Sequence, residues 1–154
     1  MRSFWLFCHL LGAVMWIGGG LAAMHASIAG NKLERGHQGI VARLVAAIYA
    51  RAITPGAALS VLSGVFLSLT YMGAMNRGDI RVAMSPWLMA MQGAGVLGAA
   101  VVLMVTAPAV NRLTRIDPVM QAGPFDALRR RQRVSGMIAT TLAFLGLVSA
   151  VMFR

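Results

Sequence analysis

The chain has 154 residues, of which 58% are hydrophobic and only 12% are charged. A soluble domain of this length usually carries about 25% charged residues, so this composition excludes most soluble classes of protein. Its 14 lysines and arginines outnumber four acidic residues, for a formal net charge of +10. These cations are confined to the ends and loops of the predicted helices, as orientation signals are, so we expect no nucleic-acid partner.

Four uncharged stretches cover residues 3–31, 52–76, 82–111 and 134–153. Each can cross a bilayer, because about 20 apolar residues at 1.5 Å per residue span the hydrocarbon core. We therefore predict an all-α fold, an integral membrane four-helix bundle forming a single domain, with helices at about 4–29, 53–75, 84–110 and 134–153. The acidic residues all fall in the predicted loops, which disfavours a proton-coupled transporter with a buried carboxylate; they are Glu34, Asp79, Asp117 and Asp126.

The segment Gly39–Tyr49 is apolar apart from Arg43 and leads directly into the second predicted span. It is either an interfacial helix or an extension of that span. The sequence Thr54-Pro55-Gly56 then predicts a kink, because proline removes a backbone donor. Small residues follow at helical spacing and predict close helix packing: Ser60, Gly64 and Ser68 on the second span, and Ala94 and Gly98 on the third.

The basic residues predict how the chain is oriented in the membrane. Cytoplasmic loops are rich in lysine and arginine. Ten basic residues fall on one side of the predicted topology: Lys32, Arg35, Arg43, Arg51, Arg112, Arg115, Arg129, Arg130, Arg131 and Arg133. Four fall on the other: Arg2, Arg77, Arg81 and Arg154. This asymmetry predicts a multi-pass protein, surrounded by the lipid bilayer, with both termini on the outer side.

Two histidines fall inside the first predicted span, where ionisable side chains are rare and suggest function. His9 lies near its outer end and His25 near its cytoplasmic end. His9 and Trp16 are seven residues apart and therefore share a helix face, with Gly12 between them. A buried neutral imidazole can hold a b-type haem or a copper ion. It can equally be a structural histidine that is hydrogen-bonded to a neighbouring helix.

Several methionines fall near the outer ends of the second and third predicted spans, on the same side as Cys8 and His9: Met72, Met75, Met84, Met89 and Met91. Thioether and thiolate sulfurs suit Cu(I), and His/Met is an established pair of haem ligands. Met91 is about as far from the start of its span as His9 is from its own, so Met91 is the leading candidate for the second ligand. Methionine is also a common core residue, and packing remains the alternative.

Arg51 begins the second span on the cytoplasmic side, beside Tyr49. It can pair with a haem or porphyrin propionate through charge-assisted hydrogen bonds. Alternatively, it extends toward the headgroups as an anchor. His25 has a similar predicted depth and could join Arg51 in a site distinct from that of His9.

The segment from His9 to Gly19 (HLLGAVMWIGG) is followed by Tyr49-Ala50-Arg51, Pro55-Gly56 and Leu62-Ser63-Gly64. With these motifs the chain resembles the CopD-like group of small four-helix membrane proteins, in particular its uncharacterised bacterial members. It is more distantly similar to HemJ-type protoporphyrinogen oxidases. The likeness covers the first two spans well and the others by helix count and length. It implies a bacterial inner-membrane protein in which His9 binds haem or porphyrin, or handles copper as in CopD relatives.

One departure from the HemJ pattern concerns the third span. That pattern has a lysine a few residues after a tryptophan, whereas here Met91 follows Trp87 and the span contains no lysine. The departure counts against protoporphyrinogen oxidation and would make a His9/Met91 haem site specific to this chain.

Three hypotheses follow for the function. The first is a redox or porphyrin protein that binds haem b. The second is a copper-handling protein that uses Cys8, His9 and the outer methionines. The third is a protein without a cofactor, acting as a non-catalytic subunit or assembly factor. A homodimer or a larger membrane complex is compatible with all three.

Overall fold

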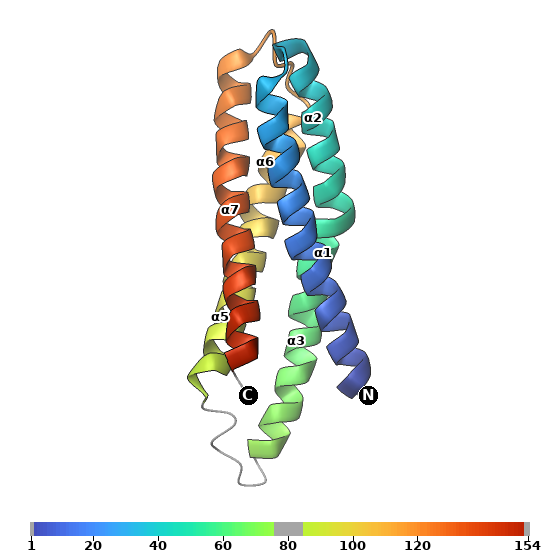
Figure 1. Cartoon of the computed structure of the whole chain (residues 1–154), viewed down its shortest axis with the longest axis vertical. Coiled ribbons are helices and arrows are strands. Elements are labelled where there is room, and N and C mark those ends of the chain that lie inside the picture. Colours follow the sequence, from blue (N-terminus) through green and yellow to red (C-terminus); the bar gives the residue numbers. More distant parts are fainter. Residues whose placement is uncertain (1, 76–84, 153–154) are drawn as a thin grey trace.

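The computed structural model describes residues 2–75 and 85–152, without the side chains at 71, 72, 74 and 75. The described chain is all-helical (Figure 1). Its elements are α1 (Arg2–Ala29), the 3₁₀ turn η1 (Gly30–Lys32), α2 (Arg35–Ile48), the π-helical η2 (Tyr49–Ile53), α3 (Thr54–Met75), α5 (Pro86–Ala100), the π-helical η3 (Val101–Thr106), α6 (Ala107–Leu113) and α7 (Ala122–Met152).

Four continuous helical segments are long and apolar enough to cross a membrane, by length and composition: Arg2–Lys32, Arg35–Thr70, Pro86–Leu113 and Ala122–Met152. The predicted all-α fold with four membrane-spanning helices is confirmed at this level. Large apolar side chains cover the outside of these helices, among them Phe7, Leu62, Met104 and Val151. Such a surface suits contact with lipid, because the lipid tails are as apolar as these side chains.

The bundle has two distinct ends (Figure 1). We call one the basic end; it holds η1, the start of α2 and the connection between α6 and α7. The other is the terminal end, where α1 begins and α7 ends. The first and last helices therefore meet the same end, as an even number of spans requires.

The helices extend further at the basic end than the uncharged stretches predict. α7 begins at Ala122, not near Val134, and includes the arginine-rich segment. Its first turns contain good helix formers such as Ala127, Leu128 and the arginines, and Pro124 is tolerated there. Phe125 anchors this extension, since it is fully buried against Ala42 and Leu113. Charge thus marks the limit of the apolar segment but not the end of the helix.

The segment before the second span is a helical extension and not a separate interfacial helix. α2 continues through η2 into α3. A kink was predicted at Thr54-Pro55-Gly56; directly before this sequence the structure has the π-helical segment η2, which ends at Ile53. A second π-helical segment, η3, ends just before Ala107-Pro108. Proline removes an N–H and its ring crowds the carbonyl four residues earlier, and a wider π turn relieves that crowding.

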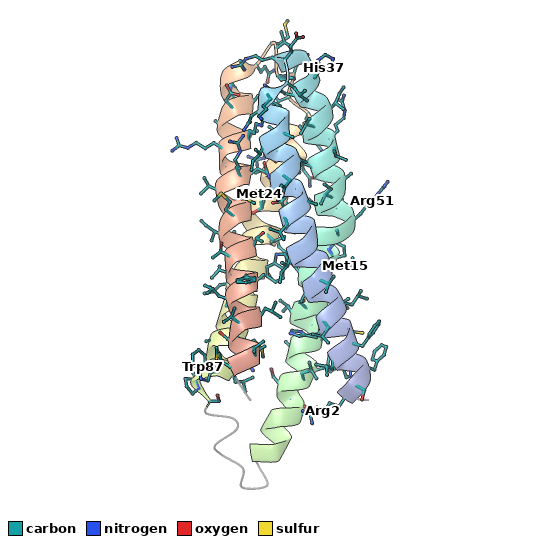
Figure 2. All side chains as sticks on the ribbon, viewed as in Figure 1. Arg2, Met15, Met24, His37, Arg51 and Trp87 are labelled. Carbon is teal, nitrogen blue, oxygen red and sulfur yellow. The ribbon has the colours of Figure 1, made fainter. Side chains whose placement is uncertain are left out.

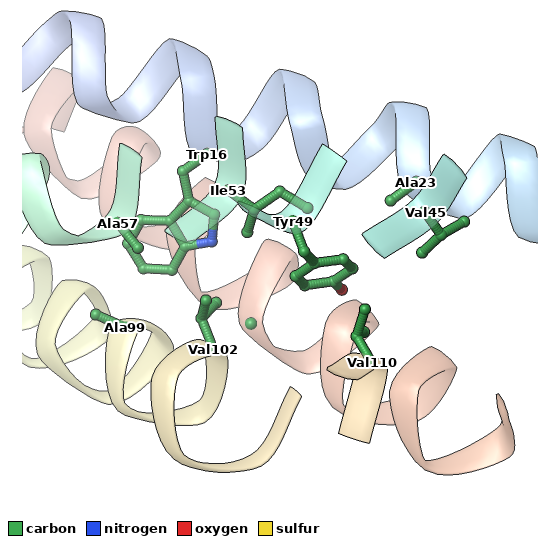
Figure 3. Close-up of a cluster of buried hydrophobic side chains, with 10 residues drawn as sticks. Trp16, Ala23, Val45, Tyr49, Ile53, Ala57, Ala99, Val102 and Val110 are labelled. Atoms are coloured by element: carbon green, nitrogen blue, oxygen red, sulfur yellow. The ribbon is translucent and has the colours of Figure 1, made fainter. Parts of the chain in front are cut away.

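The main core lies between the middle of the bundle and the basic end. Figure 3 shows Trp16, Tyr49, Ile53, Val102 and Val110 converging there from three of the four spans. The inward stripe of α1 is buried at Gly12, Trp16, Gly20, Ala23 and Ser27. Its continuation toward the terminal end, Cys8 and His9, is only half-buried. The closest helix pairs are α1 with α3 and α5 with α7.

Arginines on α7 fasten the basic end. Arg129 donates to Gln38 Oε1 (2.9 Å) and to the Ser27 carbonyl (3.3 Å) near the end of α1. Arg133 donates to Asn31 Oδ1 (2.6 Å). Cations at the carboxyl end of a helix stabilise its unsatisfied carbonyls. These three hydrogen bonds join α7 to the end of α1, the following turn and the start of α2.

Candidate functional site

The imidazole of His9 is held against the backbone of α3. Its Nδ1 lies 2.9 Å from the Ser60 carbonyl oxygen and 3.3 Å from Ser63 Oγ. A carbonyl oxygen can only accept, so Nδ1 carries the proton. Nε2 then has a free lone pair, and within the described residues it makes no hydrogen bond. This is the tautomer that leaves Nε2 able to bind a metal, and it is equally that of a structural histidine hydrogen-bonded to a neighbouring helix.

Glycines position this ring by bringing two backbones into contact. A Cβ on Gly12 would lie 2.7 Å from the Ser60 nitrogen and 2.8 Å from the Gly56 carbonyl oxygen. A Cβ on Gly56 would lie 2.8 Å from the Trp16 nitrogen. Only residues without a Cβ allow α1 and α3 to approach this closely. The predicted packing glycine Gly64 has a further role, because a Cβ there would lie 3.4 Å from Cε1 of the His9 ring.

Trp16 is the inner boundary of the site. Its side chain is 3% exposed and its ring lies across the bundle on Gly98, where a Cβ would be 2.9 Å from Cη2 and Cζ2. Its Nε1 is buried and has no hydrogen-bond partner in the described structure. The ring fills the middle of the bundle (Figure 3). It therefore lies between the main core near the basic end and the half of the bundle that contains His9, where Ser60 and Ser63 are buried.

Met91 lies across the bundle from His9. Trp16 and Gly98 are in contact. His9 lies seven residues before Trp16, and Met91 lies seven residues before Gly98. Each is therefore about 10 Å from that contact along its own helix, in the direction of the terminal end. Seven residues are close to two turns, so His9 shares a face with Trp16, and Met91 shares a face with Gly98. Both side chains are half-buried. The count of turns gives the two residues similar depth on α1 and α5, but no contact among the described residues joins His9 to Met91.

The other candidate residues of the haem hypothesis lie apart from His9. His25 is exposed, about 24 Å from His9 along α1, and its Nδ1 donates to the Leu21 carbonyl (2.9 Å). Arg51 is exposed in η2 and points away from the bundle (Figure 2). No contact among the described residues joins His25 to Arg51. The structure therefore brings neither residue to the His9 site nor the two to a site of their own.

The copper candidates are only partly described. Cys8 is half-buried and unpaired, next to His9 in sequence. Met89 is 65% exposed. The side chains of Met72 and Met75, and the whole of Met84, lie outside the described residues. Within the described part, no three His, Cys, Asp or Glu side chains come together in a metal-binding group.

Several polar contacts of the site were not predicted from the sequence. Gln92 donates to Ser68 Oγ (2.8 Å) and joins α5 to α3 on the terminal side of Trp16. The hydrogen bonds from His9 to Ser60 and Ser63 are those of the alternative given above, a histidine hydrogen-bonded to a neighbouring helix; only the identity of these partners, more than 50 residues away, was not predicted. The available signal was the run of small polar residues on the inward face of α3. Ser60 and Ser68 were assigned to packing alone.

Comparisons with known proteins find nothing similar: no family model matches the chain, and neither a curated protein nor a solved structure resembles it significantly. The candidate site therefore rests on the residues and their geometry.

Proposed function

We propose that this chain is a multi-pass protein of the bacterial inner membrane that binds b-type haem, with His9 as an axial ligand, and acts in membrane redox or porphyrin chemistry. The observation that carries the proposal is the hydrogen bond from His9 Nδ1 to the Ser60 carbonyl. It fixes the tautomer and the orientation of the ring, and it leaves Nε2 for iron.

The surroundings of His9 include small residues against which a flat, apolar group would pack. The inward faces on the terminal side of Trp16 carry small residues, among them Gly64 and Ala94, and are less buried than the core near the basic end. Met91, at similar depth on α5, is the proposed second ligand. Haem would supply one-electron chemistry there, and the His/Met pair would raise its reduction potential relative to a pair of histidines. The chain's own contribution is to orient the imidazole and to exclude water.

Arg51 fits a membrane anchor better than a propionate partner. It lies on the other side of Trp16 from His9, and its side chain points outward (Figure 2). A long, exposed arginine in an apolar segment extends toward the headgroups. We therefore propose that Arg51 contacts the lipid headgroups. We propose no cofactor role for His25, which is exposed and lies far from His9.

The test is an oxidised-minus-reduced absorption spectrum of the detergent-purified protein, with metal analysis of the same sample. We expect a Soret band and the α-band of a b-type haem. His9→Ala should abolish the band, and added imidazole should restore part of it by entering the vacated position. His25→Ala is the matched control, because His25 makes the same type of Nδ1 bond but lies on the exterior; it should keep the full spectrum.

Met91 is tested separately. Met91→Leu should keep the haem but convert it from low-spin to high-spin, whereas Met89→Leu, at an exposed methionine of the same helix, should change nothing. A colourless protein made with ample haem supply contradicts the proposal. Copper in place of haem would favour the copper-handling alternative, and the absence of both would favour a non-catalytic subunit or assembly factor.

A further inference from the structure

A groove opens at the basic end, between the start of α2 and the connection from α6 to α7. It has a volume of about 340 Å³. One wall is formed by Gly36, Gly39 and Arg43 of α2, and the other by residues 113–119, including Arg115 and Asp117. The groove is thus lined by two guanidinium groups and one carboxylate, well away from His9.

The side chains of the two groove arginines have no bonding role in the described structure. The guanidinium groups of Arg43 and Arg115 make neither a hydrogen bond nor an ion pair with any described residue, although the Arg115 backbone nitrogen donates to the Arg112 carbonyl oxygen (3.1 Å). Three other arginines at this end are engaged: Arg35 pairs with Asp126 (3.2 Å), and Arg129 and Arg133 hold the α1–α2 turn. Arg112, Arg130 and Arg131 also have no side-chain bond with a described residue, but only Arg43 and Arg115 line the groove. A guanidinium has five donors arranged to grip an oxyanion. Two uncommitted ones facing a single groove therefore favour an anionic ligand.

The acidic residue of the groove does not neutralise them fully. Asp117 Oδ1 accepts from the backbone nitrogens of Val119 (2.7 Å) and Met120 (3.2 Å). This Asx turn shapes the wall and engages Oδ1, and the single negative charge of Asp117 faces two guanidinium groups. Around it the basic end carries nine lysines and arginines in the described part, against Glu34, Asp117 and Asp126. The electrostatic potential at the groove is therefore positive.

Apolar side chains surround the groove and distinguish a lipid from a soluble anion. On α2, Ile40 and Leu44 are 57% and 55% exposed on successive turns next to Gly36, Gly39 and Arg43. On the opposite wall, Val119 is 59% exposed and its neighbour Met120 is 83% exposed. A soluble phosphate would not contact these apolar side chains, whereas the acyl chains of a lipid would pack against them. α2 runs from the groove toward the apolar segment, which is the direction that acyl chains take.

The geometry points to a binding site for an acidic phospholipid, with the phosphate between Arg43 and Arg115 and the acyl chains along Ile40 and Leu44. Charge-assisted hydrogen bonds from the guanidinium groups hold the phosphate, and the glycines leave room for the headgroup. This inference does not depend on haem binding at His9.

The test is native mass spectrometry of the delipidated, detergent-solubilised protein titrated with phosphatidylglycerol, phosphatidylcholine or inorganic phosphate. We expect preferential binding of phosphatidylglycerol. The double variant Arg43→Gln/Arg115→Gln should weaken it at least tenfold. The matched control, Arg130→Gln/Arg131→Gln, removes the same charge from exposed positions of α7 and should change it less than threefold. Equal losses in the two double variants would show a general charge effect and overturn the site.

A second variant tests the groove without changing charge. A Cβ at Gly36 meets no atom within 4 Å, so Gly36→Leu leaves the backbone packing unchanged and fills the groove. A Cβ at Gly123, at the start of α7, is equally unobstructed, which makes Gly123→Leu the control. Only Gly36→Leu should reduce phosphatidylglycerol binding. Unchanged binding in Gly36→Leu, or saturable binding of inorganic phosphate that displaces the lipid, would overturn the proposal.

Discussion

Gly12 determines how closely α1 and α3 approach, and hence where the His9 ring lies. Gly12→Ala would place a Cβ against the backbone of α3, at 2.7 and 2.8 Å from two of its atoms, which cannot move as a side chain can. We expect the free energy of unfolding to fall by about 1–3 kcal/mol, the usual range for overpacking. Thermal unfolding in detergent measures the effect.

The control for this prediction is Gly18→Ala on the same helix. A Cβ at Gly18 meets nothing within 4 Å, and alanine is a better helix former than glycine. This variant should unfold at the same temperature as the parent chain or slightly higher. If Gly12→Ala behaved like Gly18→Ala, the backbone contact between α1 and α3 would be looser than the structure has it.

For single residues, the sequence could propose His9 as a candidate ligand but could not say which of its ring nitrogens is free. The choice follows from Ser60, which is distant in sequence and reaches His9 only through the glycine contacts between α1 and α3. The similar depth of Met91 was predictable from counting turns. The sequence left two directions open for Arg51, toward a propionate or toward the headgroups, because the face it occupies depends on the extra residue that the π-helical segment η2 introduces.

Among the elements, the four spans were predictable because charge is excluded from the apolar core of a bilayer. The start of α7 was not, since the arginines between Arg129 and Arg133 are good helix formers that end an apolar segment without ending a helix. The π-helical segments also escaped prediction. A proline indicates that a helix must adjust, but only packing decides how it does so.

The hydroxyl of Thr106 joins η3 to α7 inside the bundle. It lies 2.9 Å from Ser135 Oγ and 3.1 Å from the Val101 carbonyl oxygen, and Thr106 is fully buried. Thr106→Val keeps the shape and removes both bonds. We expect a loss of about 0.6–2 kcal/mol in the free energy of unfolding, as for other interhelical hydrogen bonds in membranes.

Thr70→Val is the matched substitution for Thr106→Val. Thr70 is exposed, and its hydroxyl donates only to the Leu67 carbonyl of its own helix. Denaturant titration should show little change for this variant. A loss for Thr70→Val as large as that for Thr106→Val would mean that the contact between η3 and α7 adds nothing to stability.

For the whole molecule, the distribution of basic residues predicts that the basic end is cytoplasmic and the terminal end is outside. In a Cys8→Ala background, Ser3→Cys should react with a membrane-impermeant maleimide in intact cells. Gly123→Cys, at an exposed position of the basic end, should react only after the membrane is permeabilised. The reverse labelling pattern would show that the chain is inserted the other way round.

The pairing of the spans also bears on how the protein is made. α1 packs most closely with α3, the next membrane segment to be synthesised, and α5 packs most closely with α7 in the same way. Each helical hairpin can therefore assemble in the membrane as soon as its own two spans have left the ribosome. The Trp16 ring, lying on Gly98 of the second hairpin, is then among the contacts that form last, when the two hairpins join.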